Sequence, residues 1–250
     1  MRTWWTLTRR ELAGFFLSLT GYVIIAAAVL LMGGSFVVLI TNLQREATPM
    51  PVTEMFYNTQ FFWLILLLST PVITMLLFAL EKFTGTFETL MTTPVSDLQV
   101  VLAKFVAALV FYTVMWLPLL GCLFVVRYYT RDEWVFDPGV IASTYLGILL
   151  LGSLFISLGC CASALTRSQV IAAIISLVFG ACVFMLAYVA DQVPARGNWT
   201  GQVLACFGLF EQMHDFVRGV VDTRPVVLLG TLTLFFLFLT LRVVESRRWK

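Results

Sequence analysis

The sequence predicts an all-α integral membrane protein with six transmembrane helices. Of its 250 residues, 60% are hydrophobic and only 12% are charged, and the mean hydropathy is +0.94. Soluble globular domains contain about 45–50% apolar and about 25% charged residues, so a soluble fold of this length could not bury so much apolar surface. The net charge of +2 is too small to indicate a nucleic-acid partner. Residues 1–250 are therefore expected to form a single transmembrane domain.

Each span is placed where ionisable side chains are absent, because a charged group is costly in hydrocarbon. A helix needs about 20 residues to cross about 30 Å of hydrocarbon. The expected spans are about 21–41, 61–80, 105–126, 144–165, 169–190 and 226–244. Pro71 and Pro118 should bend the second and third of these helices, since proline cannot donate a backbone hydrogen bond.

The N-terminal segment 3–20 is expected to form an interfacial helix. Trp4 and Trp5 stand close to Arg9 and Arg10, a combination that suits the headgroup region of a membrane. Thr8-x-x-Glu11 fits a capping box within this segment. The alternative is an ordinary basic flank of the first span.

The connection 81–104 is expected to form a helix–turn–helix hairpin outside the membrane. One helical face carries apolar side chains at the spacing i, i+4, i+7 and i+8, namely Phe83, Phe87, Leu90 and Met91. Thr86 and Glu88 add polar groups, Pro94 ends the helix, and Ser96-x-x-Gln99 starts the next one. Such a hairpin could be a docking surface for a soluble partner. The alternative is a loop that packs only on its own bundle.

The connection 191–225 is too apolar for a solvated loop. Five apolar side chains follow one helical face, namely Leu209, Met213, Phe216, Val217 and Val220. Short helices that dip into the outer leaflet would explain this pattern, and a surface amphipathic helix without a role in transport is the alternative. The single histidine, His214, is expected to be a polar surface or interface side chain.

The distribution of basic residues predicts the orientation. If both termini lie on the same side, that side holds 10 of the 16 Lys and Arg residues and the other side holds 6. The basic side is normally cytoplasmic. Both termini are therefore expected in the cytoplasm.

The motifs that the chain lacks narrow its function. The sequence has no GxxxxGK[ST] phosphate-binding loop and no Cys/His metal spacing, so we expect no enzymatic activity, no cofactor and no metal in this chain. The centres of the expected spans carry no ionisable residue, although ion-coupled transporters place such groups there. Energy is therefore expected to come from a cytoplasmic partner.

Several stretches of the chain resemble ABC-2-type permeases, with the GldF-like (gliding-motility-associated) branch nearest and the NosY-like permeases next. The cytoplasmic loop is similar over residues 81–90 (EKFTGTFETL), 93–96 (TPVS) and 103–105 (AKF). The segment 210–224, the tail 241–249 and the start around Arg9-Arg10-Glu11-Leu12 are similar as well.

This resemblance implies an ABC-2 exporter fold with an N-terminal elbow helix and re-entrant helices before the last span. It implies a transporter in the bacterial inner membrane with two permeases, as a homodimer or heterodimer, surrounded by membrane lipid. Two separate ATP-binding subunits would hold ATP and magnesium, and any extracytoplasmic part would be a separate subunit. The implied coupling residues to the ATPase are Phe83, Thr86, Phe87, Glu88, Leu90, Met91 and Pro94. The implied elbow residues are Trp4, Trp5, Arg9 and Arg10, and the re-entrant residues are Phe210, Phe216, Gly219, Asp222 and Arg224.

The sequence therefore predicts the permease subunit of an ATP-driven ABC transporter. Two alternatives stay open at this point. One is a non-transporting ABC-like complex that transmits force or assembles envelope machinery, and the other is an ATP-independent secondary transporter.

Overall fold

A computed structural model describes residues 2–43, 52–86, 95–130, 137–192 and 208–248. The described residues form helices joined by short turns and contain no strand. Six helical stretches are long and apolar enough to cross a membrane, which confirms the predicted all-α fold. They are Leu19–Thr41, Phe61–Thr84, Asp97–Tyr128, Pro138–Leu165, Gln169–Gln192 and Thr223–Ser246.

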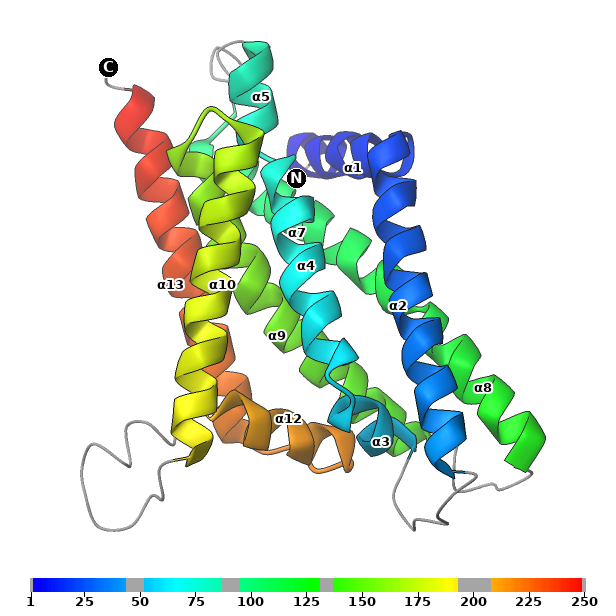
Figure 1. Ribbon diagram of the computed structural model, residues 1–250. Coiled ribbons are helices and arrows are strands. Elements are labelled where there is room, and N and C mark those ends of the chain that lie inside the picture. Colours follow the sequence, from blue (N-terminus) through cyan, green and yellow to red (C-terminus); the bar gives the residue numbers. More distant parts are fainter. Residues whose placement is uncertain (1, 44–51, 87–94, 131–136, 193–207, 249–250) are drawn as a thin grey trace, which may run out of the picture.

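Helix α9 (Pro138–Leu165) lies at the centre of the bundle. It packs against α4 (Phe61–Met75), α10 (Gln169–Gln192) and α13 (Thr223–Arg248) (Figure 1). Two glycines permit this close packing. A Cβ atom at Gly152 would lie 2.2 Å from the Tyr112 ring, and one at Gly159 would lie 2.2 Å from the Thr74 hydroxyl. Small residues on α9 therefore set how closely its neighbours approach.

The third span consists of two consecutive helices that meet at Pro118, where a bend was expected. Helix α7 (Asp97–Trp116) ends just before Pro118, and α8 (Pro118–Thr130) continues the same span (Figure 1). The Ser96 hydroxyl caps α7 by accepting from the Gln99 amide at 3.4 Å, as the Ser-x-x-Gln pattern predicts. This span begins at Asp97 rather than near residue 105, so part of the predicted 81–104 connection is membrane-length helix.

The second span is interrupted after Pro71 rather than at it. Helix α4 continues through Pro71 to Met75, and α5 (Ala79–Thr84) begins after a three-residue turn. The Ser163 hydroxyl of α9 accepts hydrogen bonds from the Phe78 and Ala79 amides, at 3.1 and 3.0 Å. This one side chain replaces the helical acceptors that the turn removes.

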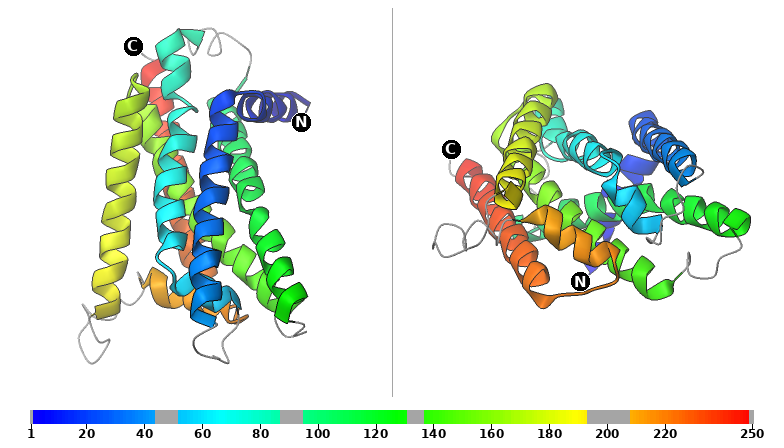
Figure 2. Two further views of the ribbon diagram at one scale, coloured as in Figure 1. Left: turned by 45° about the vertical axis from the view of Figure 1, so that its right-hand side comes forward. Right: turned by 60° about the horizontal axis from the view of Figure 1, so that its bottom comes forward.

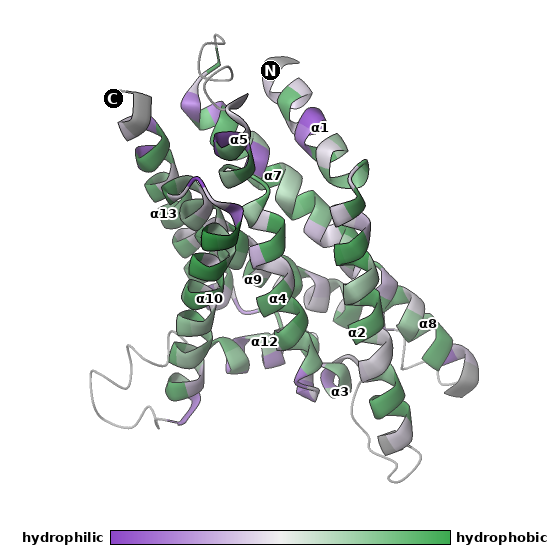
Figure 3. Ribbon diagram, turned by 45° about the horizontal axis from the view of Figure 1, so that its top comes forward, coloured by the Kyte–Doolittle hydropathy of each residue, from purple (hydrophilic) through white to green (hydrophobic). Residues whose placement is uncertain are grey.

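The two ends of the bundle carry different elements. One end, which we call the termini end, holds α1 (Arg2–Phe16), α5 and the last turns of α13 (Figures 1 and 2). The other, which we call the opposite end, holds the short helices α3 (Val52–Asn58) and α12 (Leu209–Val217). Hydrophilic positions gather near these two ends, whereas the long helices between them are mainly hydrophobic (Figure 3).

Helix α1 is the predicted amphipathic elbow helix and lies across the bundle axis (Figure 1). It packs on α7, where the Phe15 ring stacks on Phe111 with centroids 4.9 Å apart. The chain then turns into α2 (Leu19–Leu43). A Cβ at Gly21 would lie 2.1 Å from the Phe15 carbonyl oxygen, so the turn requires glycine.

The capping box expected at Thr8-x-x-Glu11 is wrong. Thr8 is buried inside α1, and its hydroxyl donates to the Trp4 carbonyl at 3.0 Å instead of capping a helix start. Helix α1 begins at Arg2, which leaves the Glu11 side chain available for tertiary contacts.

Candidate functional site

A buried lysine joins three helices at the termini end. Lys104 of α7 is 1% exposed, and its Nζ lies 2.9 Å from Glu11 Oε2 of α1 and 2.9 Å from Glu81 Oε1 of α5. It also donates to the Leu77 carbonyl at 2.9 Å. A buried charge is tolerated only when it is paired and hydrogen-bonded, and these three acceptors fulfil that condition. We call Glu11, Glu81 and Lys104, together with Arg10, the charge cluster.

Arg10 completes the charge cluster on its exposed side. One of its guanidinium nitrogens lies 2.7 Å from Glu11 Oε1 and 3.3 Å from Glu81 Oε1, and the side chain is 54% exposed. Two cations and two carboxylates make the cluster electroneutral. Burial by itself would raise the pKa of Glu11, but Lys104 and Arg10 lower it by more, so the net pKa lies below its usual value. Glu11 is therefore ionised at neutral pH.

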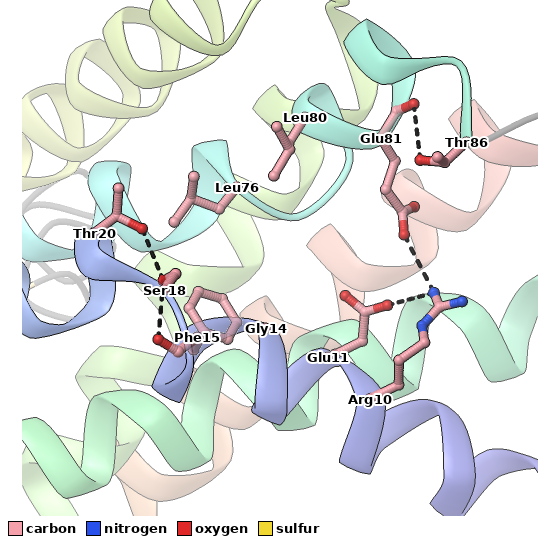
Figure 4. Close-up of a pocket in the computed structure, with 10 residues that line it drawn as sticks. All are labelled: Arg10, Glu11, Gly14, Phe15, Ser18, Thr20, Leu76, Leu80, Glu81 and Thr86. Atoms are coloured by element: carbon pink, nitrogen blue, oxygen red, sulfur yellow. Dashed lines mark hydrogen bonds and ion pairs between the residues drawn. The ribbon is translucent and has the colours of Figure 1, made fainter.

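The charge cluster borders a cavity of about 610 Å³ between the elbow and α5 (Figure 4). Its polar lining comes from Arg10, Glu11, Ser18, Thr20, Glu81 and Thr86, and its apolar lining comes mainly from Phe15, Leu76 and Leu80. Glu81 Oε2 is buried and has no hydrogen-bond partner among the described residues. This oxygen lies inside the protein, where no described group donates to it.

Only part of the predicted coupling segment is described. Phe83 at the end of α5 is 74% exposed, and Gly85 ends the helix at a φ of +76°. The Thr86 hydroxyl lies 2.9 Å from the Thr84 hydroxyl and lines the cavity. The other predicted coupling residues, Phe87, Glu88, Leu90, Met91 and Pro94, lie outside the described residues.

The predicted elbow residues divide into two groups. Arg10 belongs to the charge cluster, whereas Arg9 is exposed beside it. The Trp4 and Trp5 rings lie 6.4 Å apart, and Trp5 is 63% exposed. An exposed tryptophan at this level suits the membrane interface.

At the opposite end, the predicted re-entrant residues hold α12 in place. The Phe210 ring packs against Trp63 and Phe184, with centroids 4.5 and 5.3 Å apart. The buried Phe216 offers its carbonyl to the Ser143 hydroxyl at 2.6 Å. Gly219 follows α12 with a φ of +91°, a conformation that glycine adopts without strain.

The last two predicted re-entrant residues start the final span. Asp222 Oδ1 accepts a hydrogen bond from the Arg224 amide at 3.2 Å, at the N-terminus of α13. This contact satisfies one of the free amides in the first turn of the helix.

Sequence reasoning missed a second buried carboxylate, Glu54 of α3. Its side chain is 4% exposed, and Oε1 lies 2.8 Å from an Arg218 guanidinium nitrogen and 3.1 Å from His214 Nε2. Thr53 adds a hydrogen bond to the Val217 carbonyl at 3.1 Å. These contacts fasten α3 to α12. His214 is thus an interface side chain, as expected.

The charge cluster was missed for a similar reason. Glu11, Glu81 and Lys104 stand at the edges of the apolar segments, where charges are usually solvated, and they are far apart in sequence. No spacing in the sequence indicates that these three residues meet. Among the described residues, no group of three or more His, Cys, Asp or Glu could hold a metal ion.

Comparison with known proteins agrees with this architecture. The family model described as "ABC-2 family transporter protein" matches residues 38–242, which is most of the chain. No curated protein sequence matches the chain. With six membrane-length helices and this match, the protein is a multi-pass membrane protein that belongs to the ABC-2 transporter family, as a permease subunit of an ABC transporter.

Proposed function

We propose that this chain forms the translocation pathway and couples to a separate ATP-binding subunit through the tip of α5. The tip comprises residues 83–86, with Phe83 74% exposed. The observation that carries the proposal is the charge cluster directly behind the tip, because it connects α5 to the rest of the bundle. An exposed aromatic side chain beside a rigid anchor suits a docking surface.

Three contacts allow force at the tip to reach the spans. Glu81 transfers it to α7 through Lys104, and Lys104 transfers it onward to α1 through Glu11. The neighbouring Lys82 donates to the Ala164 carbonyl near the end of α9. Displacement of α5 would therefore move the elbow, the third span and the central helix together.

The remaining features of the proposal extend the resemblance and the charge distribution of the sequence. The termini end faces the cytoplasm of a bacterial cell, and the chain lies in the inner membrane as part of a GldF-like permease. Two ATP-binding subunits, which hold ATP and magnesium, dock on two permease copies in a homodimer or heterodimer. Glu88 and the other coupling residues beyond Thr86 complete the docking surface, and any extracytoplasmic part is a separate subunit.

The distribution of buried charge favours an external energy source. Ion-driven transporters carry ionisable groups near the middle of their spans. Here Lys104 and Glu81 are buried at the termini end, and Glu54 is buried at the opposite end. The charges at each end of the bundle therefore join the ends of neighbouring helices.

The experiment tests the tip with one charge substitution. Co-express the chain with an ABC-type ATP-binding subunit from the same genome, purify the complex in detergent, and measure the affinity between the subunits. Phe83→Asp should weaken binding about tenfold, as loss of a central interface aromatic does. Ser246→Asp is the matched control, because it puts the same charge on an exposed position of α13 at the same end.

Two results would overturn the proposal. The first is equal binding of the ATP-binding subunit by the wild type and Phe83→Asp, which would place docking elsewhere. The second is ion-driven flux from vesicles that contain this chain alone, which would make it a secondary transporter. ATP hydrolysis by the complex without flux of any tested substrate would support the force-transmitting alternative.

A further inference from the structure

The single histidine of the chain lies against a buried carboxylate at the opposite end. His214 of α12 is the only histidine among the 250 residues, and its Nε2 lies 3.1 Å from Glu54 Oε1 of α3. The His214 side chain is 30% exposed, whereas the Glu54 side chain is 4% exposed. The imidazole can therefore exchange a proton with water, while its partner is buried enough that solvent screens their interaction only weakly.

Two uncharged hydrogen bonds join the same two helices on either side of Glu54. The Thr53 hydroxyl donates to the Val217 carbonyl at 3.1 Å, and the Tyr57 hydroxyl donates to the Phe210 carbonyl at 3.0 Å. Burial raises the pKa of the Tyr57 phenol, so this hydroxyl keeps its hydrogen at neutral pH. These two contacts therefore hold α12 on α3 without any dependence on pH near neutrality.

The described charged groups around His214 are one arginine and several carboxylates. Arg218 Nε and one of its terminal nitrogens lie 3.0 and 2.8 Å from the same Glu54 oxygen that His214 approaches. Helix α9, which also packs on α12, carries no charged side chain. The carboxylates are Glu54 of α3, Glu211 and Asp215 of α12, and Asp191 near the end of α10. The surroundings of the imidazole therefore carry a net negative charge.

Protonation of His214 changes the strength of one contact and leaves the others as they are. A carboxylate oxygen can only accept, so Nε2 carries the hydrogen of this contact whether the imidazole is neutral or charged. A second proton, at Nδ1, makes the donor cationic, and a cationic donor binds a carboxylate more strongly than a neutral one. Histidine is the side chain that ordinarily changes charge between pH 5 and 8. The contact therefore strengthens as the pH falls through that range and weakens as it rises.

We infer that His214 makes the attachment of α12 to α3 dependent on pH. Protonation holds α12 more firmly on α3, and after deprotonation the contacts of Thr53, Tyr57 and Arg218 hold it with less free energy. Helix α3 leads into the second span and α12 leads into the last one, so the proton controls how firmly these two spans are joined at the opposite end. That the proton comes from the extracytoplasmic medium is the one point that rests on the proposed function.

Hydrogen exchange of the detergent-purified chain at pH 5.5 and pH 8 tests the inference. Rates are corrected for the intrinsic pH dependence of amide exchange. Peptides from α3 and α12 should then open about fivefold less often at pH 5.5, which is the difference between a charged and a neutral hydrogen bond. Peptides from the central helix α9 should show no change.

Three variants separate the proton on His214 from a general effect of charge. His214→Gln keeps an N–H donor but cannot gain a charge, so α12 should exchange equally at both pH values. Glu54→Gln removes the carboxylate that a charged imidazole binds, and it should abolish the pH response as well. Glu211→Gln is the matched control, because it removes an exposed carboxylate from α12 itself and should keep the wild-type response.

Three results would overturn the inference. Equal exchange of wild-type α12 at both pH values would show that the contact does not respond to the proton. A pH response that persists in His214→Gln would assign it to another group. Loss of the response in Glu211→Gln as well as in Glu54→Gln would assign it to the overall charge of this end. All of these measurements use the chain without an ATP-binding subunit, so they are independent of docking at the tip.

Discussion

The Lys104 ammonium lies 2.9 Å from the Glu11 carboxylate, although the two residues are 93 positions apart in the chain. The contact joins the elbow helix to the third span in a place that water barely reaches. Since Lys104 also meets Glu81, its removal should leave the two carboxylates with only the half-exposed Arg10 as a shared cation.

Lys104→Met should therefore destabilise the protein by about 3 kcal/mol, the cost of leaving a buried charge unpaired. Thermal unfolding in detergent, followed by tryptophan fluorescence, measures this. The matched control is Arg242→Met, which breaks an exposed pair with Glu245 and should cost less than about 1 kcal/mol. Similar losses in both variants would contradict the role of Lys104. The triple variant Lys104→Met, Glu11→Gln, Glu81→Gln should recover most of the stability, because no buried charge remains.

The elbow contact should be sensitive to acid. The pKa of folded Glu11 lies below its unfolded value of 4.5, so its ionised form stabilises the folded state. For such a group the stabilisation is fully present above pH 4.5 and is lost as the pH falls through the folded pKa. Melting temperatures measured as the pH is lowered should therefore fall less steeply in Glu11→Gln than in the wild type. Glu245→Gln, a partly exposed control, should follow the wild-type curve.

The central helix should tolerate no side chain at its two crossing points. Gly152→Ala places a Cβ 2.2 Å from the buried Tyr112 ring, so α9 and α7 must separate at a cost of about 1–3 kcal/mol. Gly230→Ala is the control, since a Cβ at Gly230 of α13 meets nothing within 4 Å. It should be neutral or stabilising by up to about 1 kcal/mol, because alanine favours the helix. Equal melting temperatures for the two variants would refute the packing role of Gly152.

The short helices at the opposite end should loosen when Glu54 loses its arginine. Arg218→Met leaves the buried Glu54 carboxylate with His214 as its only ionisable partner among the described residues, and it should loosen the contact between α3 and α12. Hydrogen exchange should accelerate in peptides from α3 and α12 and stay unchanged in α9. The exposed Arg224→Met is the control. Unchanged exchange in α12 would show that its apolar face alone holds it.

Hydropathy determines the spans because each must be long, apolar and almost free of charge. The positions of α2, α9 and α10 could therefore be predicted from the chain. Helix α3 was not predicted, since it is short and carries the charged Glu54. The depth of Lys104 was not predictable either. A charge at the edge of a span is normally solvated, and only the docking of α1 over it turns Lys104 into a buried group.

The turn between α4 and α5 determines which part of the second span can move as one body. The amides of Phe78 and Ala79, which the turn leaves without helical acceptors, both donate to the hydroxyl of Ser163 in α9. Rotation of α5 therefore breaks two hydrogen bonds to one side chain, whereas rotation of the whole span would disturb every contact of α4 within the bundle. The second span can therefore bend between α4 and α5, where Ser163 of α9 holds the chain. A displacement of α5 is therefore passed to the central helix α9 at Ser163, in addition to its path through Lys104 to α7 and α1.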